Sequence, residues 1–201
     1  MLQNIPNILT LLRILLIPVF VIFFYLPWQY AAEACAIVFA LAAITDWFDG
    51  YLARKLEQVS ALGAFLDPVA DKLMVAAALI LLVQQDPIPG LAIPVLVIIG
   101  REITISALRE WMAEIGARAQ IAVSAIGKVK TAFQMTAIFL LIFRNDLFGL
   151  PLYTIGFVLL YVAVVLTLWS MFVYLRAAWP SLSNQADTQT EENARSGRSS
   201  A

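Results

Sequence analysis

The sequence predicts an all-α integral membrane protein with six transmembrane helices. Three observations predict this fold class. Of the 201 residues, 62% are hydrophobic and only 13% are charged, and the mean hydropathy is +0.85, well above the apolar share of a soluble domain. The apolar residues form runs of about 20, the length that spans a bilayer as a helix. Prolines and short polar stretches separate these runs, as is typical of connections between helices.

The six expected helices cover nearly the whole apolar part of the chain. The first and sixth contain long charge-free runs, whereas the middle four carry charged residues toward one end. Their connections are marked by Pro27, Pro87, Pro89 and Pro151 and by the polar run from Arg144 to Asp146. The expected spans are residues 6–26, 31–56, 61–84, 90–113, 121–143 and 152–177.

The basic residues predict the orientation. With six alternating spans, Arg54, Lys55, Arg109 and Arg118 fall in or beside connections on one side, and of the thirteen basic residues only Arg144 lies opposite. Because cytoplasmic loops are enriched in lysine and arginine, we expect both termini to be cytoplasmic and any polar cavity near these residues to open to the cytoplasm.

The remaining composition bounds the organisation and the chemistry. We expect one membrane domain over residues 1–180, followed by a polar, disordered tail over 181–201. The N-terminus lacks the basic region of a signal peptide, so we expect it to be retained. No histidine and one cysteine are present, which leaves carboxylates for acid–base work. No soluble domain is visible, and we expect no nucleic-acid partner.

Four aspartates interrupt the apolar sequence in the second and third expected helices. A carboxylate in hydrocarbon costs several kcal/mol unless it has a partner. Asp46 and Asp49 share one face of a helix, and Asp67 and Asp71 share a face of the next. If the two helices are antiparallel, the pairs face each other at matching depths, about 13 to 20 Å from the connecting turn.

Four converging carboxylates repel one another unless cations lie between them. Oxygen ligands suit hard ions such as Mg²⁺, Mn²⁺ or Ca²⁺, so we interpret the four aspartates as a two-metal site. Two alternatives are a structural set of buried acids paired with Arg54 and Lys72, and the ion path of a cation transporter.

Two further polar groups lie near the same end of the expected bundle. Asn7, Thr10 and Arg13 recur at steps of three and share a helix face; the alternative is an interfacial anchor with a snorkelling arginine. The second group predicts an anion site, because arginine and lysine suit phosphate, although these cations can also be topology charges paired with glutamates. We expect Arg101, Ser106 and Arg109 on one side of the fourth helix, with Lys128, Lys130 and Thr131 starting the fifth.

The aspartate pattern resembles the signature of the CDP-alcohol phosphotransferase family, D-x-x-D-G-x-x-A-R, eight residues, then G-x-x-x-D-x-x-x-D. It matches at Asp46, Asp49, Gly50, Ala53, Arg54, Gly63, Asp67 and Asp71. The resemblance implies two divalent cations, Mg²⁺ or Mn²⁺, held by the four aspartates, with Asp71 as the catalytic base. It also implies that the cytidine diphosphate binds against Gly50, Ala53, Arg54 and Gly63, with phosphate contacts from Asn7, Thr10 and Arg13. The small residues among these can instead serve close helix packing.

The cationic group indicates an acceptor alcohol that carries its own phosphate. The resemblance therefore implies transfer of a phosphatidyl group from CDP-diacylglycerol to glycerol 3-phosphate, bound by Arg101, Arg109, Lys128, Lys130 and Thr131. It also implies a homodimer in the lipid of a bacterial inner membrane, with the active site facing the cytoplasm. Alternatives are another acceptor, such as inositol phosphate or serine, a cation transporter, or a structural subunit.

Overall fold

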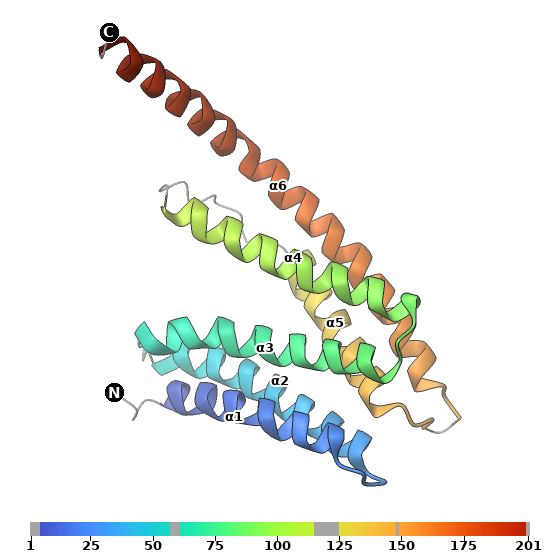
Figure 1. Cartoon of the computed structure of the whole chain (residues 1–201). Helices are drawn as coiled ribbons and strands as arrows, with labels where there is room; N and C mark the ends of the chain where they lie inside the picture. The colour runs from blue at the N-terminus through green and yellow to red at the C-terminus, as the bar shows by residue number, and fades with distance from the viewer. Residues whose placement is uncertain (1–4, 57–60, 115–124, 148, 200–201) are drawn as a thin grey trace.

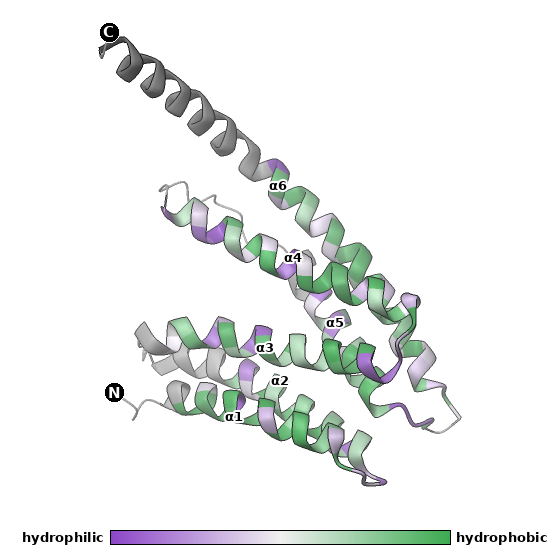
Figure 2. Ribbon diagram, in the orientation of Figure 1, coloured by the Kyte–Doolittle hydropathy of each residue, from purple (hydrophilic) through white to green (hydrophobic). Residues whose placement is uncertain are grey.

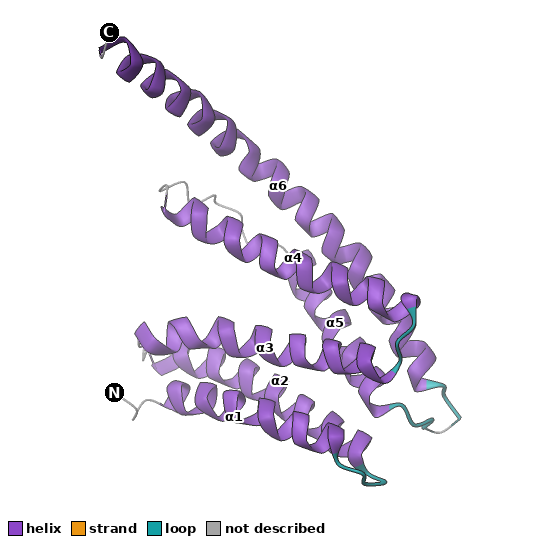
Figure 3. Ribbon diagram, viewed as in Figure 1, coloured by secondary structure: helices purple, strands orange, loops and turns teal. Residues whose placement is uncertain are grey.

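The computed structural model describes residues 5–56, 61–114, 125–147 and 149–199, all helical apart from short connections. Side chains are described throughout except at residues 5–7, 47, 49–56, 61–62, 64, 125–128 and 177–199. The described residues form six helices (Figures 1 and 3). They are α1 (Ile5–Tyr25), α2 (Ala31–Leu56), α3 (Ala61–Gln85), α4 (Pro89–Glu114), α5 (Ala125–Phe143) and α6 (Leu152–Ser199).

The predicted helix boundaries agree closely with the structure. The first four helices begin and end within one residue of the predicted positions, and α5 ends at Phe143 as predicted. The predicted start of the fifth helix, residue 121, lies outside the described residues. The sixth helix is longer than predicted, since α6 continues to Ser199 beyond the last turns of the bundle (Figure 1). A helix without a packing partner is marginal in water, and a disordered tail over 181–201 stays a prediction.

The helices form two groups, joined by α5 and by a contact between α3 and α4. Helices α1, α2 and α3 contact one another, α4 contacts α6 and α3, and α5 contacts α2, α3 and α6. The connections after α1, α3 and α5 lie together at one end of the molecule, and the N-terminus lies at the other (Figures 1 and 3). The ribbons of α3 and α4 meet at their shared connection and diverge toward the N-terminal end (Figure 1).

Apolar side chains fill the interior of the bundle and also cover its outside. Phe20, Phe39 and Leu79 are among the fully buried residues of one continuous core. Gly156 of α6 packs so closely on α5 that an added Cβ would lie 2.9 Å from the Cβ of Leu140. Small residues at helix contacts are typical of membrane bundles.

The outer surface indicates a lipid environment. Leu96 is 72% exposed, Phe65 67% and Val165 66%, and they belong to three different helices. Soluble proteins rarely expose apolar side chains on this scale. Within the described residues, three helices are long and apolar enough to cross a membrane, in α1, α4 and α6. The prediction of an all-α integral membrane protein is confirmed.

A polar cluster links α3 to α5 and α6 at the end of the molecule where the connections after α1, α3 and α5 lie. Arg144 donates two hydrogen bonds to the carboxylate of Asp86, at 2.8 and 2.6 Å. Tyr153 donates a third, at 3.1 Å, and the guanidinium of Arg144 lies over its ring. Arg144 itself has a φ of 58°, a left-handed conformation that ends α5. These contacts hold the C-terminus of α3 against the connection between α5 and α6.

Candidate active site

Helix α1 contacts both aspartate-bearing helices through polar side chains. Arg13 Nη1 lies 2.9 Å from Asp46 Oδ1 of α2, and Thr10 donates a hydrogen bond to Asp67 of α3. Arg13 and Thr10 are both about 1% exposed, whereas the side chain of Asp46 is 47% exposed. The step of three residues therefore does place Thr10 and Arg13 on one buried face, as predicted, and this face is turned toward the aspartates.

The carboxylate of Asp71 interacts with charged residues of four helices, α1 to α4. Its carboxylate is repelled by the charges of Asp46 and Glu102 and attracted by those of Arg13 and Lys72. The interaction between Asp46 and Asp71 agrees with the predicted antiparallel packing of α2 and α3, in which these two residues lie at matching depths. The second predicted pair, Asp49 with Asp67, includes a side chain outside the described set.

The described carboxylates supply the ligand atoms that a hard cation prefers, but they do not by themselves form a complete metal site. Asp46, Asp67 and Asp71 supply oxygen atoms, the ligands that Mg²⁺ and Mn²⁺ prefer. Among the described side chains, no three acidic, cysteine or histidine groups lie close enough together to hold a metal ion. Asp49, the fourth predicted ligand, is outside that set. The carboxylate ligands fit a divalent cation, and Arg13 contacts one of these carboxylates, that of Asp46.

The predicted nucleotide-contacting residues fall largely outside the described side chains. This holds for Asn7, Gly50, Ala53 and Arg54, whose backbone lies in α1 and α2. Gly63 is described and is buried near the start of α3. Thr10 and Arg13 contact Asp67 and Asp46, so on this side the residues predicted to bind the nucleotide touch those predicted to bind the metal.

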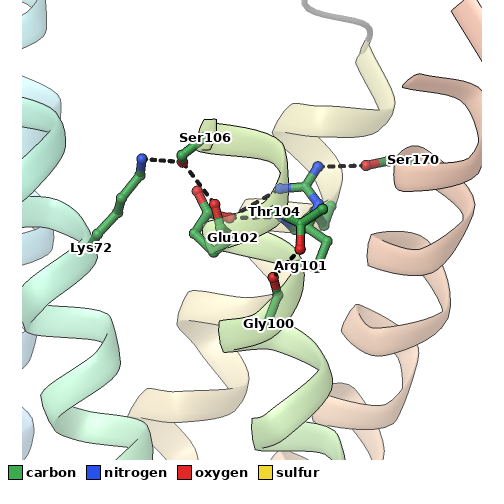
Figure 4. Close-up of polar contacts among 8 residues, drawn as sticks. Lys72, Gly100, Arg101, Glu102, Thr104, Ser106 and Ser170 are labelled. Atoms are coloured by element: carbon green, nitrogen blue, oxygen red, sulfur yellow. Dashed lines mark hydrogen bonds and ion pairs between the residues drawn. The ribbon is translucent and has the colours of Figure 1, made fainter. Parts of the chain in front are cut away.

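The predicted anion site contains a carboxylate at its centre. Glu102 Oε2 lies 3.0 Å from Arg101 Nη1 and 3.7 Å from Lys130 Nζ. Arg101 Nη2 donates a second hydrogen bond, 2.8 Å long, to Ser170 Oγ of α6 (Figure 4). The cationic side chains are 11% and 8% exposed, and Glu102 is 39% exposed. Helices α4, α5 and α6 therefore meet around two buried cations with one half-exposed anion.

Lys72 connects the aspartates to this cationic cluster. It follows Asp71 in α3, and its ammonium group donates a hydrogen bond to Ser106 Oγ of α4 (Figure 4). Ser106 in turn donates to the backbone carbonyl of Glu102 at 2.7 Å. A continuous polar path thus crosses from α3 to α4 at the end where the two ribbons diverge. Figure 2 shows hydrophilic residues on both helices in this part of the bundle.

The predicted arrangement of α4 is wrong for one residue. Arg101 and Arg109 both contact α6, where the guanidinium of Arg109 lies 5.3 Å from the ring centroid of Tyr174. Ser106 contacts α3 instead, because five residues along a helix correspond to about 500°, or some 140° from Arg101. Lys130 is buried in the cluster, Thr131 is exposed, and the side chain of Lys128 is not described.

Sequence reasoning missed the role of two residues near this cluster. From the sequence, Glu102 is expected only as a partner for topology charges, and no contact is expected for Ser170. Thr167, one turn from Ser170, is fully buried, and its hydroxyl has no partner among the described residues. Polar residues inside an otherwise apolar membrane helix are the signal that could have identified both α6 residues.

The arrangement combines general-base, cation-binding and anion-binding groups at one end of the bundle. A carboxylate, Asp71, interacts with Lys72 and with Glu102, the acid that contacts Arg101 and Lys130, and such cations suit a phosphate. Oxygen ligands beside it suit divalent ions that would neutralise a second phosphate group. Such a site can bring two phosphorylated substrates together, one near the aspartates and one near Arg101 and Lys130.

Comparisons with known proteins agree with this chemistry. A family model described as CDP-alcohol phosphatidyltransferase matches residues 3–169. A protein from Yersinia enterocolitica is 56% identical over 179 residues, covering 89% of this chain and 97% of the relative. One from Pectobacterium atrosepticum is 55% identical over 175 residues, covering 87% of this chain and 94% of the relative. Both are named CDP-diacylglycerol--glycerol-3-phosphate 3-phosphatidyltransferase.

The family model covers the aspartate pattern, α1 and the cationic residues of α4 and α5, and members of this family generally use divalent metal ions. The predicted family is therefore confirmed by a match that spans most of the chain. The chain belongs to the CDP-alcohol phosphatidyltransferase family.

Proposed function

We propose that this protein transfers the phosphatidyl group of CDP-diacylglycerol to glycerol 3-phosphate, forming phosphatidylglycerophosphate and releasing CMP. The names of the Yersinia and Pectobacterium relatives support both substrates. The single structural observation that carries the proposal is the proximity of Asp71 to the cationic cluster. Lys72, the residue after Asp71, donates a hydrogen bond to Ser106 of α4. Glu102, which repels Asp71, contacts Arg101 and Lys130, so an acceptor whose phosphate is held by these cations would present its glycerol hydroxyl group near a carboxylate base.

Each group then has a defined role in the reaction. Arg101 and Lys130 bind the phosphate of glycerol 3-phosphate, with Arg109, Lys128 and Thr131 nearby in the sequence. Asp71 accepts the proton of the attacking hydroxyl group as its oxygen bonds to the phosphorus that carries the diacylglyceryl group. The bond from that phosphorus to the oxygen bridging to CMP breaks, and CMP leaves with that oxygen. Positioning the two reactants in this way supplies much of the rate enhancement.

The donor is bound on the other side of Asp71. Thr10 and Arg13 contact the aspartates, and with Asn7, Gly50, Ala53, Arg54 and Gly63 they are assigned to the cytidine diphosphate. Asp46, Asp49, Asp67 and Asp71 would hold two divalent cations, Mg²⁺ or Mn²⁺. These ions, when bound, neutralise the pyrophosphate and stabilise the charge that develops on the leaving phosphate.

We place the protein in the bacterial inner membrane with six spans, both termini in the cytoplasm and a polar cavity open to that side. The distribution of basic residues supports this orientation, since Arg144 lies with the connections at the opposite end. The acyl chains of the donor stay in the lipid while its headgroup meets the water-soluble acceptor. The exposed apolar helix faces suit lipid contacts and a homodimer.

The test is CMP release by the protein purified in detergent. CDP-diacylglycerol and Mg²⁺ are supplied with glycerol 3-phosphate, inositol phosphate or serine in separate reactions. We expect CMP release with glycerol 3-phosphate and its loss when EDTA removes the metal. Release with another acceptor alone would change the assigned substrate. Metal-dependent ion flux in liposomes without CMP release would support a transporter instead.

A further inference from the structure

Glu102 occupies the accessible side of the two cations that we assign to the acceptor phosphate. One of its oxygen atoms, Oε2, contacts Arg101 at 3.0 Å (Figure 4). The same atom lies 3.7 Å from Lys130 Nζ. The two cations are almost completely buried, and the carboxylate between them is 39% exposed. An anion arriving from solution would therefore meet Glu102 before it met either cation.

The two cations require a counter-anion whenever the acceptor is absent. Burying a charge is costly unless an opposite charge pairs with it. Lys130 is also repelled by Arg101 and Arg109, so the cluster carries more positive than negative charge. Glu102 is the one anion found in contact with either Arg101 or Lys130 in the described part of the chain. Its carboxylate thus stabilises an anion site that has no anion bound.

We propose that Glu102 is an exchangeable internal counter-anion, whose carboxylate is displaced from Arg101 and Lys130 by the phosphate of the acceptor. This inference rests on the proposed function, because it concerns the acceptor site of the same reaction. A phosphate monoester carries close to two negative charges at neutral pH and three terminal oxygen atoms. It can therefore replace one carboxylate oxygen on both cations. Arg101 Nε, which is buried and has no partner among the described residues, is a further donor in the cluster.

Exchange of one anion for another also gives acceptor selectivity. An uncharged alcohol, such as free inositol, has no anionic group that can compensate Arg101 and Lys130 if Glu102 leaves. It must bind beside an intact ion pair. A phosphorylated alcohol regains the charge interaction that it disrupts. Glu102 is therefore a specificity-determining residue that admits phosphorylated acceptors, in line with the principle that selectivity needs an unfavourable element against the wrong partner.

The test compares Glu102→Gln with the wild-type protein. Removing the competing charge should lower the KM for glycerol 3-phosphate and the inhibition constant for inorganic phosphate, each by about two- to five-fold, the range expected for one partly exposed ion pair. The KM for CDP-diacylglycerol should not change. Glu110→Gln is the matched control, because Glu110 is an exposed residue of the same helix and loses the same charge; it should leave all three constants unchanged.

A second variant separates exchange from general repulsion. Glu102→Asp keeps the charge but shortens the side chain by one methylene, so the carboxylate can no longer reach both cations. Displacement predicts that this variant also binds phosphate more tightly than the wild type. Repulsion through space predicts that it behaves like the wild type, which would overturn the proposal. A higher KM for glycerol 3-phosphate in either variant would also overturn it, because Glu102 would then be positioning the cations.

Binding of inorganic phosphate to the purified protein, measured by isothermal titration without donor or metal, makes the result independent of turnover. If the wild type releases no CMP with glycerol 3-phosphate, the proposed function fails, and titration of Glu102→Gln still tests the counter-anion. If transfer is normal and neither variant changes phosphate affinity, the counter-anion proposal alone fails. Thermal unfolding of each variant confirms that the compared proteins are folded.

Discussion

Arg13 of α1 and Asp46 of α2 form an ion pair in which the cation is buried and the anion is exposed to the site. Their closest atoms are 2.9 Å apart, and the side chains are 1% and 47% exposed. Arg13 also attracts Asp71. The guanidinium therefore neutralises part of the carboxylate cluster from the protein side, while the opposite side of Asp46 stays open to a ligand.

Replacing Arg13 should strengthen metal binding and weaken catalysis. Arg13→Met keeps much of the side-chain volume but removes a cation that competes with metal ions for Asp46. Mn²⁺ raises the unfolding temperature, and the concentration that gives half of the largest increase should be about five-fold lower in the variant than in the wild type. This is the change expected from the loss of one ion pair of ~1 kcal/mol. Transfer should slow, because the variant lacks a contact to the donor phosphates. Arg176→Met, at an exposed position of α6, is the control. Weaker Mn²⁺ binding in Arg13→Met would contradict this role.

Asp71 of α3 and Asp86, the residue directly after that helix, should respond to substitution in opposite ways. Asp71→Asn should abolish CMP release, because it removes the base, and leave the unfolding temperature near that of the wild type. Asp86→Asn should keep the specific activity but lose stability, because Arg144 loses the charge that it contacts at 2.6 Å. A lost charged hydrogen bond costs about 1.5 to 3 kcal/mol, or roughly 2 to 4 °C per kcal/mol for a chain of this length. Normal transfer by Asp71→Asn would exclude it as the base.

Arg109 should affect the acceptor more than the donor. Its guanidinium lies over Tyr174 at 5.3 Å and adds to the positive charge around Lys130. Arg109→Ala should raise the KM for glycerol 3-phosphate by roughly ten-fold, comparable to the loss of one charged hydrogen bond. The KM for CDP-diacylglycerol should change little. Arg109→Lys retains the charge and should recover part of the acceptor affinity. An equal increase in both constants would remove Arg109 from the acceptor site.

The contact between α5 and α6 should not tolerate a larger residue at Gly156. An added Cβ would lie 2.9 Å from Leu140 Cβ and 3.1 Å from the backbone at Ala137 and Leu141. Because backbone atoms cannot move aside cheaply, Gly156→Ala should lower stability by about 1 to 3 kcal/mol. Gly100→Ala is the control, since nothing lies within 4 Å of its added Cβ, and the helix should gain from alanine. Thermal unfolding in detergent measures both. An unchanged unfolding temperature for Gly156→Ala would mean that the helices can separate locally.

Some features of the site follow from spacing along a single helix. That Thr10 and Arg13 share one face of α1 was predictable, because residues three or four apart share a helix face whatever the helix packs against. The boundaries of the first four helices were predictable from local sequence, since Pro27 and Pro87 follow apolar runs of membrane-spanning length.

The sequence by itself therefore determined the class of the protein, the extent of its first four helices, the aspartate pattern and the family. Only the tertiary structure decided which charges meet. Arg13 pairs with Asp46, Glu102 lies between Arg101 and Lys130, and Lys72 reaches Ser106. Periodicity defines the faces of one helix but not the rotation of that helix against its neighbours. That rotation depends on how side chains such as Phe20, Phe39 and Leu79 pack together in the shared core.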